Sequence, residues 1–259
     1  MSYGPPRKRF GQHFLHDPGV LDRIVRSIAP AARDHIVEIG PGRGALTRPL
    51  LSRVARLDVV ELDRDLAASL AAELQDPRLH VHQGDALRFD FSALGSDLRL
   101  VGNLPYNIST PLLFHLLGYS ECFRDLHVML QKEVVDRMVA APGGRDYGRL
   151  TVSLAARCRV EKLFVIRPGA FTPPPRVDSA FARLVPEPGR RALIESETVF
   201  DRVVTQAFSQ RRKRLSNSLK GLVDAASLEA LGIDPGRRPE TLDVGAFTKI
   251  ANLCARENS

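Results

Sequence analysis

Residues 35–47 read His-Ile-Val-Glu-Ile-Gly-Pro-Gly-Arg-Gly-Ala-Leu-Thr. The first five residues are an apolar run that predicts a buried strand, and a glycine-rich turn leads from it into a helix. Gly40, Gly42 and Gly44 allow the backbone to turn tightly and to approach a nucleotide without a Cβ in the way. The spacing fits GxGxG and, with Ala45, also GxGxxA. This stretch predicts an α/β nucleotide-binding fold but does not choose the nucleotide.

Two acidic residues follow the next two predicted strands. The strand Leu57–Val60 ends at Glu61, 21 residues after Gly40, where a carboxylate would accept hydrogen bonds from both hydroxyls of a ribose. NAD and S-adenosylmethionine (SAM) use that position alike. The strand Leu79–Gln83 is followed by Gly84 and Asp85, whose carboxylate can accept a hydrogen bond from an adenine amine.

The fourth predicted strand, Leu98–Val101, runs into Gly-Asn-Leu-Pro-Tyr at residues 102–106. An open α/β sheet binds its ligands at the carboxyl ends of its strands, so Asn103 and Tyr106 are expected to face a crevice there. If Asn103 Oδ1 and a backbone carbonyl, for example that of Leu104, each accept an N–H of an adenine amine, the nitrogen lone pair is aimed at a methyl donor. Tyr106 offers a face on which a displaced base can stack.

Each of these features has an ordinary structural alternative. Asn103 and Pro105 are common turn residues, and Tyr106 could pack in the core. Asp85 could be a surface aspartate before a helix. In series, however, acidic residues after the second and third strands and an Asn-x-Pro-Tyr turn after the fourth favour a methyltransferase acting on an amino group over hydride transfer.

Composition and charge restrict the partners. The 259 residues carry 37 Lys and Arg against 30 Asp and Glu, but residues 31–120 hold 9 basic and 11 acidic residues, a net of −2. The positive excess therefore lies outside the crevice motifs, which fits a cationic small ligand in the middle and a polyanion held by the flanks. The three cysteines are scattered, so we expect no zinc site or disulfide framework and a reducing compartment, the cytoplasm. We expect no membrane span and no signal peptide.

The flanks hold the remaining candidates. Arg7, Lys8 and Arg9 form a basic arm, and His13 follows as a residue suited to lining a cleft. The loop at residues 171–176, Phe-Thr-Pro-Pro-Pro-Arg, places Phe171 where it could cover the second face of a base stacked on Tyr106, or else pack inward. Beyond a boundary at 186–189 everything reads helical, and a predicted helix Val199–Leu219 carries the cations Arg211, Arg212, Lys213 and Arg214, which favour phosphate contact.

These motifs together resemble the small-subunit rRNA adenine dimethyltransferase family, from about Arg7 to the C-terminus. The similarity rests on Gln12–Leu15, Glu38–Gly44, Glu61–Asp63, Gly84–Ala86, Gly102–Thr110, Phe171–Pro175 and Gln210–Lys213. The ordered set is highly specific, although its glycine loop is not.

The resemblance implies a fold and a division of the chain. The expected fold is α/β, a class I SAM-dependent methyltransferase domain of Rossmann-like type with a mixed seven-stranded sheet, at residues 1–185 with its basic arm. A small all-helical domain that contacts RNA is expected at residues 186–259.

The resemblance also implies a reaction and its residues. Such enzymes use SAM, without a metal, to place two methyl groups on N6 of each of two adjacent adenosines in the hairpin loop near the 3′ end of 16S rRNA. By the family pattern Asn103, Leu104, Tyr106 and Phe171 surround the target base. The cofactor is contacted by His13, Leu15, Gly40, Gly42, Glu61, Asp85 and Asn103.

Two other functions remain open from the sequence. One is the related methyltransferase class that modifies large-subunit rRNA and confers macrolide resistance; Leu104 and the Gln210–Lys213 run favour the small subunit. The other is a mainly non-catalytic assembly factor that docks through its basic flanks. We expect a monomer whose partner is the 16S rRNA of an immature small subunit.

Overall fold

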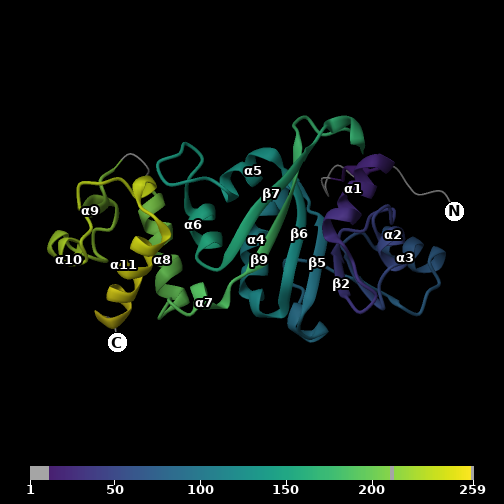
Figure 1. The fold of residues 1–259 in the computed structure, drawn as a ribbon, viewed down its shortest axis with the longest axis horizontal. Helices are drawn as coiled ribbons and strands as arrows, with labels where there is room; N and C mark the ends of the chain where they lie inside the picture. The colour runs from purple at the N-terminus through teal and green to yellow at the C-terminus, as the bar shows by residue number, and fades with distance from the viewer. Residues whose placement is uncertain (1–11, 211–212, 258–259) are drawn as a thin grey trace. The chain divides into compact units, whose positions relative to one another are not determined.

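The computed structural model describes residues 12–210 and 213–257, and its contacts divide the chain into two units (Figure 1). The first unit comprises the described residues up to Val135 together with Glu161–Pro186. The second comprises Asp136–Val160 together with the described residues from Glu187 onward. Among the described residues, no helix is both long and apolar enough to cross a lipid bilayer.

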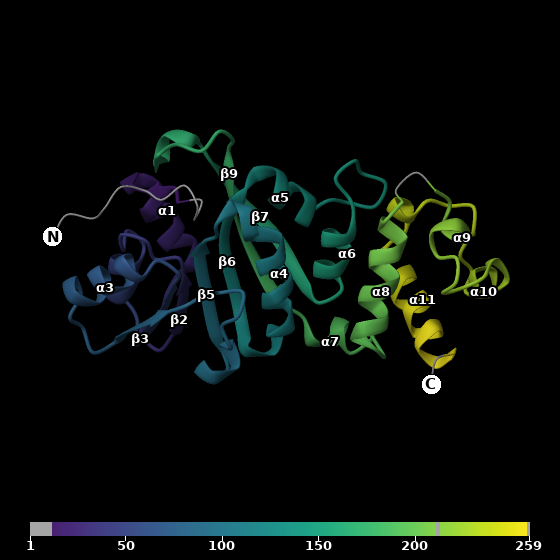
Figure 2. The same cartoon turned by 180° about the vertical axis from the view of Figure 1, so that it is seen from behind.

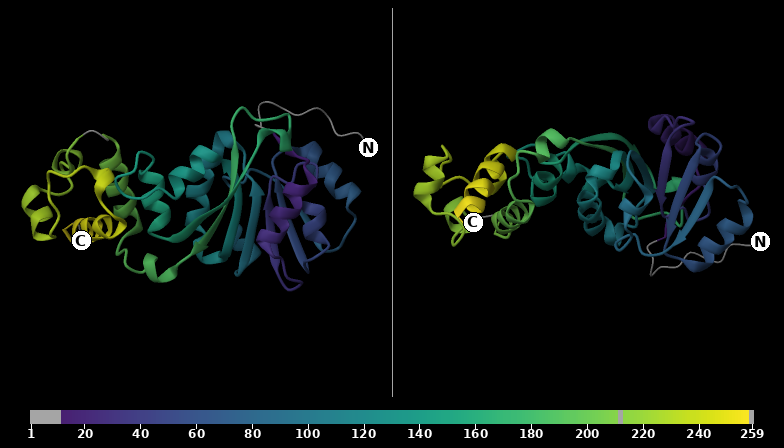
Figure 3. Two further views of the ribbon diagram at one scale, coloured as in Figure 1. Left: turned by 45° about the horizontal axis from the view of Figure 1, so that its top comes forward. Right: turned by 90° about the horizontal axis from the view of Figure 1, so that it is seen from below.

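The first unit is built on one mixed sheet of seven strands in the order β4-β3-β2-β5-β6-β9-β7, seen from opposite sides in Figures 1 and 2. Neighbours from β4 to β6 pair in parallel, whereas β9 runs antiparallel to β6. The predicted mixed seven-stranded α/β fold is therefore confirmed, and its strands can be followed in Figure 3. The strands are β2 (His35–Ile39), β3 (Arg56–Glu61), β4 (Leu79–Gln83), β5 (Leu98–Asn103), β6 (Phe123–Gln131), β7 (Cys158–Ile166) and β9 (Ser179–Pro186).

Helices join these strands, and two short strands form a separate pair. The helices are α1 (Pro18–Ile28), α2 (Thr47–Leu51), α3 (Arg64–Glu73), α4 (Ser109–Gly118) and α5 (Lys132–Met138). The separate pair is β1 (Phe14–Leu15) and β8 (Phe171–Thr172), which run antiparallel. Short 3-10 turns lie at Phe91–Leu94, Tyr106–Ile108, Ser120–Cys122 and Pro168–Ala170.

The central strands are apolar because the sheet is covered on both faces. Four of the five residues of β2 and five of the six of β5 are buried, as expected for parallel strands with helices packed on them. Helix α1 begins where the sequence places a cap: Asp17 accepts a hydrogen bond from the Val20 amide at 2.9 Å, and Pro18 occupies the first helical position.

A buried ionic network joins three strands at the ends opposite to their carboxyl ends. Arg99 of β5 is 7% exposed and donates to Asp34, just before β2, at 2.7 Å and to Asp125 of β6 at 2.9 Å. Arg124 donates to the other oxygen of Asp34 at 2.8 Å. Because guanidinium groups donate hydrogen bonds to both carboxylates, the network fixes β2, β5 and β6 relative to one another.

We predict that Asp34→Asn lowers stability at neutral pH, by about 1.5 kcal/mol for the charge-assisted hydrogen bonds that it removes. Burial opposes ionisation of Asp34, but hydrogen bonds from Ala31, Arg99 and Arg124 outweigh it and hold the pKa of Asp34 below its usual 3.8. A depressed folded-state pKa gives stability that is present above the unfolded-state pKa and is lost as pH falls through the folded-state value.

Urea unfolding of the wild type and of Asp34→Asn, at pH 7 and at pH 3 and below, measures the difference in their free energies of unfolding. The difference between wild type and Asp34→Asn should shrink as the pH is lowered below about 4. A difference that is the same at every pH would contradict the ionised form of Asp34 as the stabilising species.

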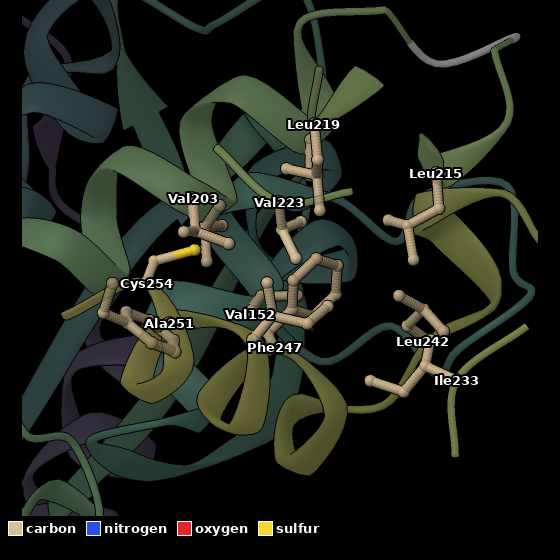
Figure 4. Close-up of a cluster of buried hydrophobic side chains, with 14 of the residues drawn as sticks. Val152, Val203, Leu215, Leu219, Val223, Ile233, Leu242, Phe247, Ala251 and Cys254 are labelled. Atoms are coloured by element: carbon tan, nitrogen blue, oxygen red, sulfur yellow. The ribbon is translucent and has the colours of Figure 1, made fainter. Parts of the chain in front are cut away.

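The second unit has its own apolar core, shown in Figure 4. Helices α8 (Glu197–Phe208) and α11 (Val244–Glu257) contribute Val203 and Phe247 to it, and Tyr147 donates from its hydroxyl to the Leu242 carbonyl at 2.8 Å. The other regular elements of this unit are α6 (Arg149–Ala155), α7 (Pro188–Arg191), α9 (Leu215–Ser218), α10 (Ala225–Ala230) and a 3-10 turn at Pro239–Thr241.

The division of the chain differs from a single boundary at 185/186. The chain does pass from the first unit to the second after Pro186, but Asp136–Val160 also belongs to the second unit. The reason is packing: Val152 and Ala156 lie in the same buried cluster as residues of α8 and α11. Nothing in the sequence between 136 and 160 marks this membership, because the partners are supplied by segments 50 to 100 residues further on.

The predicted helix Val199–Leu219 is wrong in its second half. Helix α8 ends at Phe208, and the short α9 begins only at Leu215. The amide of Leu215 donates to the Arg237 carbonyl at 2.7 Å and that of Ser216 to the Pro235 carbonyl at 3.1 Å, so neither bonds one helical turn back. A tertiary contact therefore replaces the helical hydrogen bonds, and the described cations of the basic run do not lie on a helix.

Candidate active site

A cavity of about 410 Å³ opens at the carboxyl ends of β2, β3 and β5. The sheet order reverses at β2, and ligands of open α/β sheets bind at such a reversal. The volume is in the range of small-molecule sites. The lining is Gln12–His16, Leu21, Ile24, Glu38, Gly40–Arg43, Ala45, Leu46, Arg48, Glu61, Leu62, Leu66, Gly102–Tyr106, Met129, Thr172 and Phe181.

The glycine turn after β2 forms one wall. Gly40 and Gly42 have φ angles of +67° and +56°, which side-chain-bearing residues rarely adopt. A Cβ at Gly42 would lie 3.0 Å from the Phe14 ring, so the turn also needs glycine for space. The Gly42 amide donates to Glu61 Oε2 at 3.1 Å, which ties the turn to the end of β3.

Glu61 is anchored at the mouth of this wall. It is 7% exposed, and besides Gly42 it accepts a hydrogen bond from the Asp63 amide at 2.9 Å through Oε1. Burial raises the pKa of Glu61, and the two amides act in the opposite direction. Each carboxylate oxygen has a second lone pair, so the group can still accept from ribose hydroxyls, as the sequence predicts.

Glu38 also faces the cavity, and the sequence reasoning did not assign it a role. It is 2% exposed, and its Oε2 has no hydrogen-bond partner among the residues that the structure describes. Burial raises the pKa of Glu38 to about 8. A glutamate inside an apolar strand, directly before the glycine turn, is the signal that could have found it.

These acidic groups fit SAM. The cavity is large enough for a nucleoside, Glu61 can bind a ribose, and the unpartnered oxygen of Glu38 offers a polar contact inside the cavity. Among the described residues, no group of three or more His, Cys, Asp or Glu is placed to hold a metal ion.

Asn103 ends β5 at the floor of the cavity, and its amide has a fixed orientation. Nδ2 donates to the His13 carbonyl at 2.9 Å. Because a carbonyl oxygen can only accept, this bond assigns the nitrogen end of the amide and leaves Oδ1 as an acceptor for a ligand. The residue is half-buried and lines the cavity.

Leu104 and Tyr106 continue the same wall. The Leu104 amide donates to the Met129 carbonyl at 3.1 Å, which extends the β5–β6 ladder by one residue. Tyr106 shares a hydrogen bond with Ser179 Oγ at 2.5 Å, and its ring centroid lies 5.6 Å from that of His13, with 26° between the planes. Burial raises the pKa of Tyr106, so the hydroxyl is neutral at pH 7.

The segment around β1 brings His13 and Leu15 to the cavity. His13 Nδ1 donates to the Pro173 carbonyl at 2.7 Å, which fixes the proton on Nδ1 in the neutral ring. Leu15 pairs with Phe171 in the β1–β8 register.

Phe171 packs inward. Its side chain is 2% exposed and lies in the apolar core with Phe181. Thr172, one residue on, is the member of β8 that lines the cavity. Neighbouring side chains of a strand point to opposite faces, which agrees with Thr172 lining the cavity while Phe171 is buried in the core.

Asp85 is likewise outside the cavity lining. Its Oδ1 accepts a hydrogen bond from the Leu87 amide at 2.9 Å, two residues along the loop after β4. The hydrogen bond from an adenine amine to Asp85, which the sequence predicts, stays a prediction for the protein with its cofactor bound.

The predicted RNA contacts lie only partly within the described chain. Arg7, Lys8 and Arg9, and likewise Arg211 and Arg212, fall outside the described residues. Lys213 and Arg214 are described, and both are exposed.

Comparison with known proteins agrees with this geometry. Residues 5–256 match the family model described as ribosomal RNA adenine dimethylase. The chain is 55% identical, over 96% of its length and 95% of the relative's, to a ribosomal RNA small subunit methyltransferase A from Pseudomonas putida. It is also 55% identical to a protein of the same name from Chromobacterium violaceum, over 97% of each chain.

Two solved structures resemble this one over nearly the whole chain. A dimethyladenosine transferase from Plasmodium falciparum matches with a TM-score of 0.83 and 26% identity, covering 95% of this chain and 98% of that one. The 23S rRNA methyltransferase ErmE matches with a TM-score of 0.68 and 23% identity, covering 92% and 98%, which shows the shared fold. The site and the matches lead to one conclusion: the chain belongs to the ribosomal RNA adenine dimethylase family.

Proposed function

We propose that this chain transfers methyl groups from SAM to N6 of two adjacent adenosines in the 3′-terminal hairpin loop of 16S rRNA, giving N6,N6-dimethyladenosines. The observation that carries the proposal is the fixed amide of Asn103, whose Nδ2 is held by the His13 carbonyl and whose Oδ1 is left for a ligand in the cavity. The 55% identity to two small-subunit methyltransferases supports the choice of RNA.

The residues of the cavity can activate the N6 amine of adenine, which is a poor nucleophile. An adenine amine delocalises its lone pair into the ring, and Asn103 Oδ1 together with the Leu104 carbonyl would accept its two N–H bonds and direct the lone pair outward. Tyr106 provides a ring on which the displaced base stacks, an interaction worth about 1 to 3 kcal/mol. Bound SAM supplies an electrophilic methyl group on a positively charged sulfur.

No strong base is needed in this arrangement. Tyr106 keeps its proton because burial raises its pKa, so the phenol orients the base and does not deprotonate it. Positioning supplies most of the acceleration in such an in-line displacement. A second methylation requires the singly methylated nitrogen to present its remaining N–H to the same acceptors, with the first methyl group accommodated in the cavity.

The RNA is proposed to be part of an immature small subunit, bound by a monomer in the cytoplasm. The target adenosine must lie in a loop or be flipped out of its stack to reach the cavity. Arg7, Lys8, Arg9 and the cluster at 211–214 would then hold flanking phosphates. A role in small-subunit biogenesis follows from that choice of substrate.

The competing substrate is large-subunit rRNA, and one experiment separates the two. Labelled SAM is incubated with the protein and with separated small and large subunits that lack these modifications. The proposal expects label in the adenosines of small-subunit RNA. Label in large-subunit RNA alone would reject it in favour of the macrolide-resistance type of activity.

The basic run at residues 211–214 should contribute to RNA affinity in a salt-dependent way. Replacing Arg211, Arg212, Lys213 and Arg214 by Ala is expected to reduce the log–log salt slope of binding by up to about 0.7 for each phosphate that the variant no longer neutralises. Filter binding over a range of salt concentrations measures the slope.

A matched control removes the same charge from elsewhere. It replaces four exposed arginines that already have partners in the protein, Arg26, Arg53, Arg190 and Arg256. Equal slopes for the two variants would count against a specific phosphate contact of the cluster.

A further inference from the structure

Ser179 contacts the outer end of the Tyr106 side chain. It is the first residue of β9, it is fully buried, and its Oγ lies 2.5 Å from Tyr106 Oη. This contact spans 73 residues of sequence and joins the motif after β5 to the start of β9. Ser179 does not itself line the cavity, so it touches the site only through Tyr106.

The support behind Ser179 is part of the sheet. It pairs with Gln131 at the end of β6, and the Lys132 amide donates to the Asp178 carbonyl at 2.9 Å just beside it. A hydroxyl on a strand that is paired with its neighbour has less freedom than a hydroxyl on a loop. It therefore gives the Tyr106 hydroxyl a fixed partner.

The remainder of Tyr106 is held at two other points. Ser109 Oγ donates to its backbone carbonyl at 3.1 Å, and the His13 ring lies against one face at a centroid distance of 5.6 Å. These contacts fix the backbone and limit one face of the ring, but neither holds the far end of the side chain. The hydroxyl contact fixes the direction of the ring's long axis, because it holds the atom furthest from the backbone, whereas the stacked His13 ring limits rotation about that axis.

We infer that Ser179 is a positioning residue for methyl transfer, which holds the Tyr106 ring at the place where the target adenine stacks. The inference rests on the proposed function, since it needs a flat base as the occupant of the cavity. Ser179 acts through Tyr106 alone. Breaking the hydrogen bond from either end therefore has the same consequence.

A double-mutant cycle tests this with Ser179→Ala, Tyr106→Phe and the double variant. Each single change is expected to lower the single-turnover rate at saturating SAM by about 10-fold, the value of one buried hydrogen bond, while SAM affinity is unchanged. The double variant should be no slower than either single variant. RNA with 2-aminopurine at the target position should show weaker fluorescence quenching in all three, because the base stacks less well.

Three outcomes would overturn the inference. The first is that the effects of Ser179→Ala and Tyr106→Phe on the rate are independent and add in the double variant. The others are a normal rate with normal quenching for Ser179→Ala, and an equal loss of rate in Ser218→Ala. Ser218 is a matched control because it is buried, and it donates to the Leu215 carbonyl in the second unit. If Ser179→Ala does not fold, Tyr106→Phe breaks the same bond from the cavity side, and an unchanged rate and unchanged quenching in that variant are equally decisive against the inference. If the wild-type protein does not methylate small-subunit RNA, the proposed function fails. If it methylates that RNA and the variants match it, this inference fails alone.

Discussion

Replacing Asn103 by alanine is expected to lower the single-turnover rate of methyl transfer by at least about 10²-fold, by analogy with removal of one preorganised polar group from an active site. The structure gives the reason, because the amide is held by the His13 carbonyl at 2.9 Å and presents its oxygen to the cavity. Alanine removes the acceptor for one N–H of the amine. RNA affinity should be retained, since the proposed phosphate contacts come from other residues, at 7–9 and 211–214.

The matched control is Asn252→Ala. Asn252 Nδ2 also donates to a backbone carbonyl, that of Leu193 at 2.8 Å, but in the second unit. Asn103→Asp gives a sharper test, because a carboxylate keeps an acceptor but would place a second oxygen against the His13 carbonyl. We expect it to be slow as well. Normal methylation by Asn103→Ala would show that the chain activates the amine by another group, and loss of RNA binding in that variant would favour a docking role for this surface.

Glu61→Gln is expected to weaken SAM binding by about 10²-fold or more, because hydrogen bonds to a charged group are worth about 1.5 to 3 kcal/mol each and Glu61 is proposed to accept from two ribose hydroxyls. The two oxygens of Glu61 already accept from the amides of Gly42 and Asp63. A glutamine has only one oxygen, so its NH2 group would face one of these N–H donors. The glycine turn should lose its anchor as well.

Titration calorimetry with SAM measures the affinity, and thermal unfolding without ligand reports how much of the effect is structural. Glu195→Gln serves as the control, since Glu195 is hydrogen-bonded by Arg256 at an exposed position of the second unit. Unaltered SAM affinity in Glu61→Gln would show that the Glu61 carboxylate does not bind SAM.

The parts of the fold that depend on local sequence were predictable. The strands at 35–39 and 79–83 coincide with β2 and β4. The apolar residues of β2 mark a buried parallel strand, whereas β4 lies at the sheet edge and alternates apolar and polar residues. Helix α1 begins at its Asp-Pro signal, because capping acts within three residues. Asn103 lies at the cavity because it directly follows the apolar run of β5.

The parts of the fold and site that depend on contacts between distant residues could not be predicted from the sequence. Helix α8 ends at Phe208, and α9 begins at Leu215, whose amide donates to the Arg237 carbonyl, a partner that no local pattern shows. Phe171 points to the core and Thr172 to the cavity, a choice made by the pairing of β8 with β1. The bond that orients Asn103 comes from His13, 90 residues earlier in the chain.

The most direct measurement is a crystal structure of the protein with a non-reactive SAM analogue and an RNA hairpin that carries the two adjacent adenosines. We expect adenine N6 to lie within about 3.2 Å of Asn103 Oδ1, with Nδ2 still donating to the His13 carbonyl and the base stacked against Tyr106. An adenine bound elsewhere, or an Asn103 amide turned away from the base, would contradict this expectation.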